Sequence, residues 1–319
     1  MDRIGRMRNL PELVVVCGAL LCGCGSKSNG VAGQTSTLAT GPAVPVSSIT
    51  NGDPVLLAAG DIANCKMIEG AQATAKIIEK IPGTVAALGD LALSDGSAEE
   101  FANCYDKTWG AFKSRTRPAP GNHEFHSSSA TPYFDYFGAA AGNPKKGYYS
   151  YELGSWHIIA LNGECKHTGG CQGGSPEETW LAQDLQEHRA ACTLAYWHEP
   201  LFSSGAGHGN DADYHRFWVD LYHANTTIVL NGHDHDYERF APQDPDGKAD
   251  PAHGIREFVV GTGGNHERAF SPEPQPNSEV RMTDIFGVLK LTLHPRGYDW
   301  EFIPQAGKTF HDAGTGICH

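Results

Sequence analysis

Short apolar runs alternate with polar, helix-favouring segments along most of the chain. Apolar runs of strand length predict buried strands. Residues 148–153 and 156–161 predict two successive strands that are interrupted at Gly154. The remaining runs that predict strands are 54–60, 84–88, 192–196, 227–230, 257–260, 287–292 and 298–303.

Two segments between these runs predict helices. Residues 69–80 (EGAQATAKIIEK) have helical composition, and residues 175–190 open with Ser-Pro-Glu-Glu. A serine followed by proline and two acids is typical of a helix N-terminus. Strand–helix alternation followed by a mostly β end predicts an α/β sandwich, with sheet inside and helices outside. We see no linker-like break after residue 53, so 53–319 is predicted to form one domain.

The N-terminus predicts an export signal. Three arginines lie in the first eight residues, and residues 13–21 form an apolar run of nine, far short of the ~20 residues that span a membrane. The following Leu-Cys-Gly-Cys resembles a bacterial lipobox, which makes residues 1–23 a signal peptide and Cys24 the first, lipidated residue. Ordinary secretion with cleavage nearby is the alternative. Residues 24–52, rich in Gly, Ser, Thr and Pro, are predicted to be a flexible linker.

Composition agrees with export and limits the partners. Six cysteines follow Cys24, and an even number in an exported chain predicts disulfides. Cys165 and Cys171 enclose a glycine-rich loop and form the predicted local bridge, while the other pairings stay open. Zinc binding by these thiols is disfavoured, because the chain has no CxxC pair. A net charge of −13 argues against nucleic-acid binding through bulk electrostatics, although a local cationic pocket or metal could hold an anion.

Polar side chains follow five of the apolar runs. Asp61 and Asp90 each follow a run that ends in glycine, Asn122-His123-Glu124 follows Pro118-Ala119-Pro120-Gly121, His198 follows residues 192–197, and His233-Asp234-His235 follows 228–232. Ligands bind beyond the carboxyl ends of strands in layered α/β folds, so these side chains are expected to converge. Mixed Asp, Asn and His ligands suit Zn, Mn or Fe. Two such ions about 3.5–4 Å apart can generate hydroxide and clamp a phosphoryl group.

Taken together, these blocks resemble the calcineurin-like metallophosphoesterases. The segments that carry the resemblance are GD (60–61), GD (89–90), GNHE (121–124), WH (197–198) and GHDH (232–235). The GNHE form and the continuation Asp-Tyr-Glu-Arg (236–239) look most like the purple acid phosphatase branch. The resemblance covers roughly residues 53–305. It implies a four-layer α-β-β-α sandwich with a dinuclear metal centre on one edge.

The resemblance also implies a role for each residue. Asp90 would bridge two ions. His123 stands where the family places a phosphate-contacting or acid histidine, with Glu124 supporting it. His208 resembles the substrate-side histidine of purple phosphatases, although a surface-loop histidine is the alternative. The remaining ligands would be Asp61 and His235 for the first ion, and Asn122, His198 and His233 for the second.

Two positions depart from the family pattern. The first block has Ala63 where Gly or His is usual, and Leu93 replaces the tyrosine that binds iron and gives the purple colour. Tyrosinate is a hard anionic donor suited to Fe(III), so its loss weakens the case for iron in that oxidation state. The first ion would keep only Asp61, Asp90 and His235 as protein ligands.

The sequence predicts a metal-dependent phosphoesterase that hydrolyses small phosphate esters through a hydroxide bridging two ions of Fe, Zn or Mn. Phosphomonoesters are the expected substrates. Membrane association is expected only through a lipid on Cys24. One alternative is hydrolysis of a diester or a non-phosphate ester. Another is a non-catalytic surface protein with a degenerate first metal site. The native metals, the substrate, the pH optimum and the oligomeric state are left open.

Overall fold

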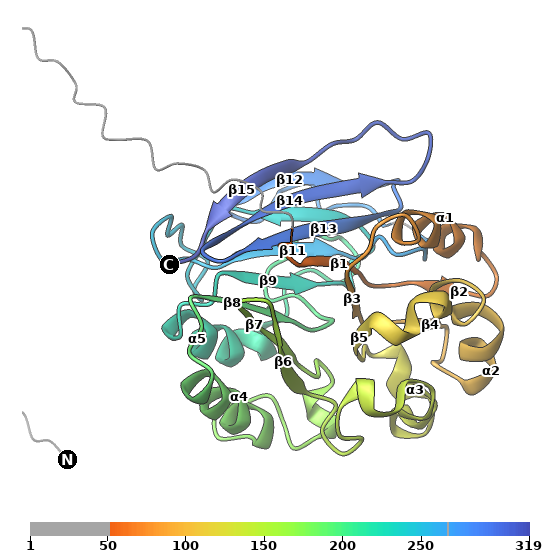
Figure 1. The fold of residues 1–319 in the computed structure, drawn as a ribbon, viewed down its shortest axis with the longest axis horizontal. Coiled ribbons are helices and arrows are strands. Elements are labelled where there is room, and N and C mark those ends of the chain that lie inside the picture. The colour runs from red at the N-terminus through yellow and green to blue at the C-terminus, as the bar shows by residue number, and fades with distance from the viewer. Residues whose placement is uncertain (1–51, 267) are drawn as a thin grey trace, which may run out of the picture. The chain divides into compact units, whose positions relative to one another are not determined.

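The computed structural model describes residues 52–266 and 268–319 (Figure 1). The predicted signal peptide, Cys24 and all but the last residue of the predicted linker lie outside the described residues. None of the described helices is long and apolar enough to cross a lipid bilayer.

The first sheet has six strands, and its centre is parallel. Strand β1 pairs in parallel with β3, and β3 pairs in parallel with β5, whereas β13 joins the other side of β1 in antiparallel orientation. The strands are, in spatial order, β15 (Ala313–Ile317), β14 (Gly297–Pro304), β13 (Gly287–His294), β1 (Val55–Ala59), β3 (Thr84–Leu88) and β5 (Thr116–Ala119).

The second sheet has seven strands, of which β7, β8, β9 and β11 run parallel. Their spatial order is β12 (Ser278–Met282), β10 (Tyr237–Phe240), β11 (Arg256–Val260), β9 (Ile228–Asn231), β8 (Cys192–Tyr196), β7 (Trp156–Ala160) and β6 (Tyr149–Leu153). A separate two-stranded ribbon consists of β2 (Ala63–Asn64) and β4 (Ala92–Leu93).

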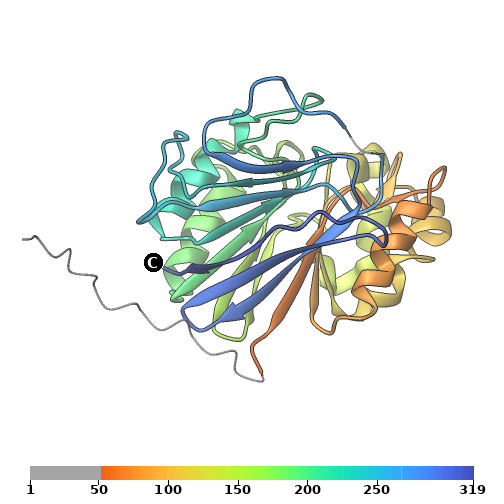
Figure 2. The ribbon, with the colours of Figure 1, turned by 90° about the horizontal axis from the view of Figure 1, so that it is seen from above.

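Helices cover the outer faces of the two sheets (Figure 2). The helices α1 (Glu69–Ile78), α2 (Ala98–Glu100) and α3 (Thr131–Phe137) lie on one side, and α4 (Pro176–Glu187) and α5 (His215–His223) on the other. Short 3₁₀- or π-helical segments occur at Phe101–Tyr105, Trp109–Arg115, His123–His126, Ser128–Ala130, Gly138–Ala141, Cys165–His167 and Ala212–Tyr214. This arrangement is the four-layer α-β-β-α sandwich that the sequence predicts.

Side-chain alternation along the strands explains the layering. Successive side chains of a strand point to opposite faces of its sheet. In β8, Leu194 and Tyr196 belong to the core cluster that contains the buried residues of the first sheet, whereas Ala195 packs in a second cluster with Leu181 of α4 and Phe217 of α5. Both faces of the second sheet are therefore covered, and its strands read as continuous apolar runs.

Three disulfides connect the six cysteines that follow the predicted signal. The local Cys165–Cys171 bridge is confirmed. The other two bridges are Cys65–Cys104 and Cys192–Cys318, and the latter ties the first residue of β8 to the C-terminal segment. Bridges of this kind are typical of exported proteins.

Candidate metal centre

The sequence-predicted ligands meet where parallel strands of both sheets end. Asp61, Asp90 and Asn122 follow β1, β3 and β5 of the first sheet, while His198 and His233 follow β8 and β9 of the second. Asp61, Asp90 and His233 have positive φ angles of 58°, 53° and 69°. Non-glycine residues seldom adopt this conformation, and it concentrates at functional sites.

Two glycines allow these turns to pack closely. A Cβ atom on Gly89 would overlap the imidazole ring of His198, and Gly89 itself has a φ of +85°. A Cβ atom on Gly121 would overlap the carboxylate of Asp90. The glycines that precede Asp90 and Asn122 in the sequence blocks are therefore required by the short separation of the loops.

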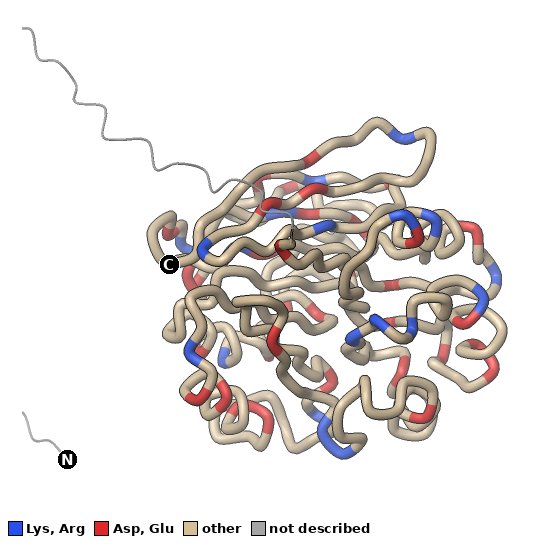
Figure 3. Tube along the Cα trace, in the orientation of Figure 1, with Lys and Arg blue, Asp and Glu red and all other residues tan. Residues whose placement is uncertain are grey.

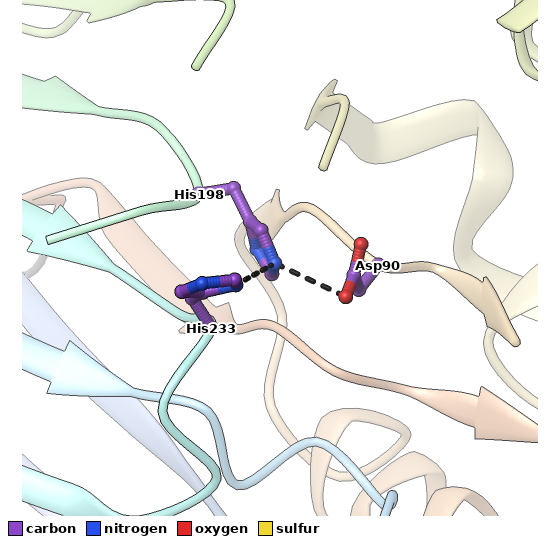
Figure 4. Close-up of side chains that lie close together, drawn as sticks. All are labelled: Asp90, His198 and His233. Carbon is purple, nitrogen blue, oxygen red and sulfur yellow. Dashed lines mark hydrogen bonds and ion pairs between the residues drawn. The ribbon is translucent and has the colours of Figure 1, made fainter. Parts of the chain in front are cut away.

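Asp90, His198 and His233 form one group of potential ligands (Figure 4). The Nε2 atom of His198 lies 3.1 Å from Oδ2 of Asp90 and 3.2 Å from Nδ1 of His233. Nδ1 of the fully buried His198 donates a hydrogen bond to the Leu88 carbonyl oxygen (2.7 Å). Because Nδ1 is the donor, the lone pair of Nε2 points toward Asp90, which is the usual preparation of a metal-binding histidine.

Asp61 and His235 form an adjacent pair with the same preparation. His235 Nδ1 donates to the carbonyl oxygen of His266 (2.7 Å), and its Nε2 lies 3.1 Å from Oδ1 of Asp61. The other carboxylate oxygen of Asp61 accepts the backbone N–H of His233 (2.8 Å). Oδ1 of Asp61 is also 3.9 Å from His198 Nε2, so the pair and the first group are contiguous.

The donor set fits metal ions. Oδ1 of Asp61 and Oδ1 of Asn122 are buried and have no hydrogen-bond donor among the described residues. Buried polar atoms without partners are rare in native proteins. Oδ1 of Asp61 faces Nε2 of His235 and of His198, so this part of the cluster consists of electron-pair donors that a cation would satisfy. Asp, Asn and His together suit Zn, Mn or Fe.

Electrostatics favour the protonation states that metals need. Burial disfavours charge on Asp90 and Asp61, but the neighbouring histidines outweigh it and lower the pKa of both carboxyls. Burial and the charge of His198 lower the pKa of His233 well below its ordinary value. In His198 the two carboxylates outweigh burial and raise the pKa well above the ordinary value. A positive charge is therefore stabilised at the His198 position, where a metal ion could replace the proton.

His123 lies beside Asp90 of this centre. Its backbone N–H donates to Oδ1 of Asp90 (2.9 Å), and its ring Nε2 is 3.6 Å from Oδ2 of the same residue. The ring Nδ1 contacts the Ser94 carbonyl oxygen. About a quarter of the His123 side chain is exposed, so Nε2 stands between the buried ligands and the solvent.

Glu124 has the contacts of a positioning residue rather than of a group that meets a substrate. It is fully buried, and its carboxylate accepts the backbone N–H groups of Asp90 (2.9 Å), Leu91 (2.8 Å) and Gly121 (2.8 Å). Burial and the charge of Asp90 raise the pKa of Glu124 to about 8, while these backbone donors oppose the rise. Glu124 therefore fixes the Asp90 turn against the Gly121 turn.

The loop that carries His208 reaches the centre. The His208 ring stacks on His233 with 3.8 Å between ring centroids, and its Nε2 contacts Arg268 Nη1. Asp234, which lies between two predicted ligands, anchors this loop by accepting from Ser203 Oγ (2.5 Å) and the Gly209 N–H (3.0 Å). Burial and Arg268 lower the pKa of His208.

Arg268 is absent from the residues predicted from the sequence. It lies in the segment that follows β11, and its backbone N–H donates to the His235 carbonyl oxygen (3.1 Å). The rule that polar side chains after parallel strands gather at one edge applies equally to β11, and it would have drawn attention to residues 261–268.

Leu93 stands at the position where the family pattern has the metal-binding tyrosine. Leu93 is buried in β4, where it pairs with Asn64 of β2. The hydroxyl of Tyr237 in the GHDH-DYER block is held by Asp312 at 2.6 Å. Tyr237 is thus engaged elsewhere and does not substitute for the missing tyrosine.

Comparison with known proteins agrees with this geometry. A model of the calcineurin-like phosphoesterase family matches residues 54–237, and the chain belongs to this family. Its curated relatives are purple acid phosphatases of Arabidopsis thaliana. Purple acid phosphatase 15 is 26% identical over 228 residues (60% of this chain, 42% of that protein), and purple acid phosphatase 22 is 30% identical over 153 residues (45% and 34%). The chain thus spans about half the length, or less, of these relatives.

Solved structures show the same fold. The purple acid phosphatase PPD1 from yellow lupin seeds superposes with a TM-score of 0.66 at 18% identity, covering 83% of this chain and 54% of that one. GAP50, described as the anchor in the inner membrane complex of Plasmodium, gives a TM-score of 0.64 at 12% identity, covering 84% and 89%. Family membership implies metal-dependent hydrolysis of phosphate esters.

Proposed function

We propose that this protein is a phosphomonoesterase with two metal ions, acting outside the cytoplasm. The observation that carries the proposal is the contiguous cluster of buried carboxylate and imidazole groups at the ends of β1, β3, β8 and β9. Asp61 and His235 would hold one ion, and Asn122, His198 and His233 the other. Asp90 lies beside His198 and would be a ligand of both ions.

When bound, two ions lower the pKa of a water molecule and neutralise charge on phosphoryl oxygens. The chain positions the other reacting groups. The Ser94 carbonyl accepts from Nδ1 of His123, so Nε2 is the atom that would donate a proton to the leaving oxygen when the ring is in its imidazolium form. Nε2 of His208 is engaged by Arg268, so we assign to this pair the binding of the substrate's negative charge.

Hydrolysis of 4-nitrophenyl phosphate and of bis(4-nitrophenyl) phosphate by the purified, metal-loaded protein tests the proposal. We expect the monoester to be the better substrate and the Asp90→Ala variant to lose at least ~10³-fold in turnover, because the shared ligand is removed. Asp95→Ala is the matched control, since Asp95 is exposed and contacts only His126 among the ion pairs of the described residues. Preference for the diester would favour the phosphodiesterase alternative, and inertness toward both would favour a non-catalytic surface protein.

The proposed location rests on two observations. The three disulfides fit an oxidising compartment, and the lipobox-like segment ends at Cys24. We propose lipid anchoring through Cys24, because acyl chains would hold an otherwise water-soluble domain at a membrane. Fractionation of the Cys24→Ala variant tests this: release from the membrane fraction is expected, and unchanged membrane binding would leave plain secretion or another anchor.

The proposed partner is a small phosphate ester rather than a nucleic acid. Acidic and basic positions are interspersed along the described trace (Figure 3), and the net charge is negative. A DNA or RNA backbone would therefore meet no extended cationic stripe in the part of the chain described. Binding of single-stranded DNA at 0.15 M salt with micromolar affinity would contradict this expectation.

A further inference from the structure

A second cluster of potential metal ligands lies away from the candidate metal centre. His157 is the second residue of β7, whereas Asp184 lies in the last turn of α4 and His188 caps the C-terminus of that helix. Helix α4 covers the outer face of the second sheet (Figure 1). His157 pairs with Thr193 of β8, and His198 follows five residues later, so the two clusters are about 16 Å apart along the strand direction.

The three side chains converge closely. Nε2 of the buried His157 lies 2.7 Å from Oδ2 of Asp184, and Nδ1 of His188 lies 3.3 Å from Oδ1 of Asp184. The candidate ligand atoms all lie within 4.8 Å of one another. Ligand atoms around a tetrahedral ion with bonds of 2.0–2.1 Å are about 3.3 Å apart. The separation from His188 already has this value, and the separation from His157 requires an opening of about 0.6 Å. The two separations involve different oxygens of Asp184, so the carboxylate would bind the ion through both oxygens or rotate to present one of them.

The partners of His157 call for a cation. Its Nδ1 is 2.7 Å from Oε1 of Glu152, so a carboxylate stands at each ring nitrogen, and Asp184 also accepts from Ser150 Oγ (2.7 Å). Carboxylates can only accept, so the ring must either be protonated or face a metal ion. If the His157 ring alone is protonated, the carboxylates of Glu152 and Asp184 leave one negative charge uncompensated. With a divalent ion and neutral rings the charge sums to zero.

The surroundings also suit a metal site. If Nδ1 of His157 donates to Glu152, the lone pair of Nε2 is directed at the ion, as in carboxylate–histidine–zinc arrangements. His188 is about half exposed and lines a groove of about 390 Å³ between α4 and α5. Of the three proposed ligands, His188 is the one that lines this groove, so an ion would approach the cluster from the His188 side.

We propose that His157, Asp184 and His188 bind one divalent ion of the Zn²⁺ class. Two imidazoles and one carboxylate are a ligand set that zinc accepts. The ion ties the C-terminal end of α4 to the start of β7, so its role is structural. It is separate from the ions of the phosphoesterase centre, and the proposal does not depend on the proposed function.

The test is the zinc stoichiometry of the full protein, measured by equilibrium dialysis against Zn²⁺ followed by elemental analysis. The wild type is expected to bind one ion more than the His188→Ala variant, or to bind that ion at least about tenfold more tightly, since loss of even an outer partner weakens metal sites 10–100-fold. His188 is half exposed, so its removal should leave the fold intact. His223→Ala is the matched control, because His223 lines the same groove outside the cluster.

A thermal melt provides a second readout. Micromolar Zn²⁺ should raise the Tm of the wild type and of His223→Ala more than that of His188→Ala. Equal stoichiometry, affinity and Tm shift in wild type and His188→Ala would overturn the proposal and leave His157 as a protonated histidine held by two carboxylates. Loss of the additional ion in His223→Ala as well would overturn the assignment of these three ligands.

Discussion

Replacing Glu124 by Gln should weaken metal binding without removing any metal ligand. The carboxylate of Glu124 accepts backbone N–H groups from Asp90, Leu91 and Gly121 at 2.8–2.9 Å, and that of Ala92 at 3.3 Å. The glutamine amide keeps one oxygen and turns an NH₂ group toward donors. The amide group can be oriented in two ways. The orientation that loses less binding energy keeps the hydrogen bonds from the Asp90 and Gly121 N–H groups and loses those from Leu91 and Ala92, of which the Ala92 bond is the longest.

The size of the effect follows from these contacts. At a pH above about 8, where the Glu124 carboxyl is ionised, a hydrogen bond to this charged acceptor contributes about 1.5–3 kcal/mol, and relief of the buried charge offsets part of the loss. We therefore expect the free energy of unfolding to fall by about 2–3 kcal/mol. For a domain of this size that corresponds to roughly 5–10 °C in Tm. The displaced Asp90 turn should also lower metal affinity about 10–100-fold, as loss of supporting partners does in other metal sites.

Equilibrium dialysis against Zn²⁺ or Mn²⁺ and thermal melting of the metal-free protein measure the two effects separately. The control is Glu178→Gln. Glu178 accepts from the Gly174 N–H (2.8 Å) and from Arg216 (3.0 Å) at the start of α4, so its loss should lower stability without changing the affinity of the centre. A folded Glu124→Gln variant that binds metal like the wild type would refute the positioning role. If that variant also lost turnover, Glu124 would act in the reaction itself.

Three further outcomes are expected. Aerobic loading with iron should give no purple colour, since Leu93 supplies no tyrosinate, and Leu93→Tyr should produce a visible charge-transfer band if the backbone keeps the family geometry. Arg268→Ala should raise KM for an aryl phosphate about tenfold or more with a smaller change in kcat, measured by steady-state kinetics, whereas Arg268→Lys should recover part of the loss. Although burial disfavours its charge, Asp53 and Asp299 raise the pKa of His294. Protonated His294 therefore contributes its full stabilisation below a pH of about 6.5, the pKa of histidine in the unfolded chain. This stabilisation is lost as the pH rises through the higher pKa of His294 in the folded protein. The difference in unfolding free energy between wild type and His294→Gln should therefore shrink from pH 5 to pH 8, and a constant difference would show that the bonds do not depend on the proton.

Hydrophobic runs in the sequence predict much of the fold, but they do not predict strands that lack such a run. Strand β15 has the sequence AGTGI, and two glycines in five residues disfavour a strand. The structure supplies the reason for them: a Cβ atom on Gly314 would overlap the Trp300 ring, and one on Gly316 would overlap the Tyr298 ring. These glycines allow aromatic side chains of β14 to lie over β15. That requirement comes from tertiary packing and leaves no local pattern.

The sequence pattern does not predict helix α5, for a related reason. Its sequence HRFWVDLYH contains aromatic and β-branched residues with modest helix propensity. Its stability comes from burying Phe217, Trp218 and Leu221 against the second sheet. Helix α4, by contrast, begins at the predicted Ser175 cap, whose hydroxyl accepts from the Glu178 N–H, and ends at Glu187, three residues before the predicted end.

The candidate site was predictable where local chain order and chemistry coincide. The six predicted ligands each follow a strand, and parallel strands deliver them to one edge. The direction in which a side chain points depends on backbone conformations that the sequence does not reveal. Glu124 is adjacent to His123, yet it turns inward to the backbone of Asp90, and Arg268 arrives from a segment without a recognised motif.

Stepwise metal removal combined with turnover tests the dinuclear centre most directly. The His188→Ala variant is used so that the proposed peripheral ion does not contribute to the count. We expect two ions per chain. Mild chelation should leave a one-ion species in which the ion at Asn122, His198 and His233 stays bound. That site has three ligands besides Asp90, whereas the other site has two. Hydrolysis of 4-nitrophenyl phosphate should follow the two-ion species and disappear with the first ion lost. Full activity in the one-ion or metal-free protein, or a chain that never binds more than one ion, would contradict the account.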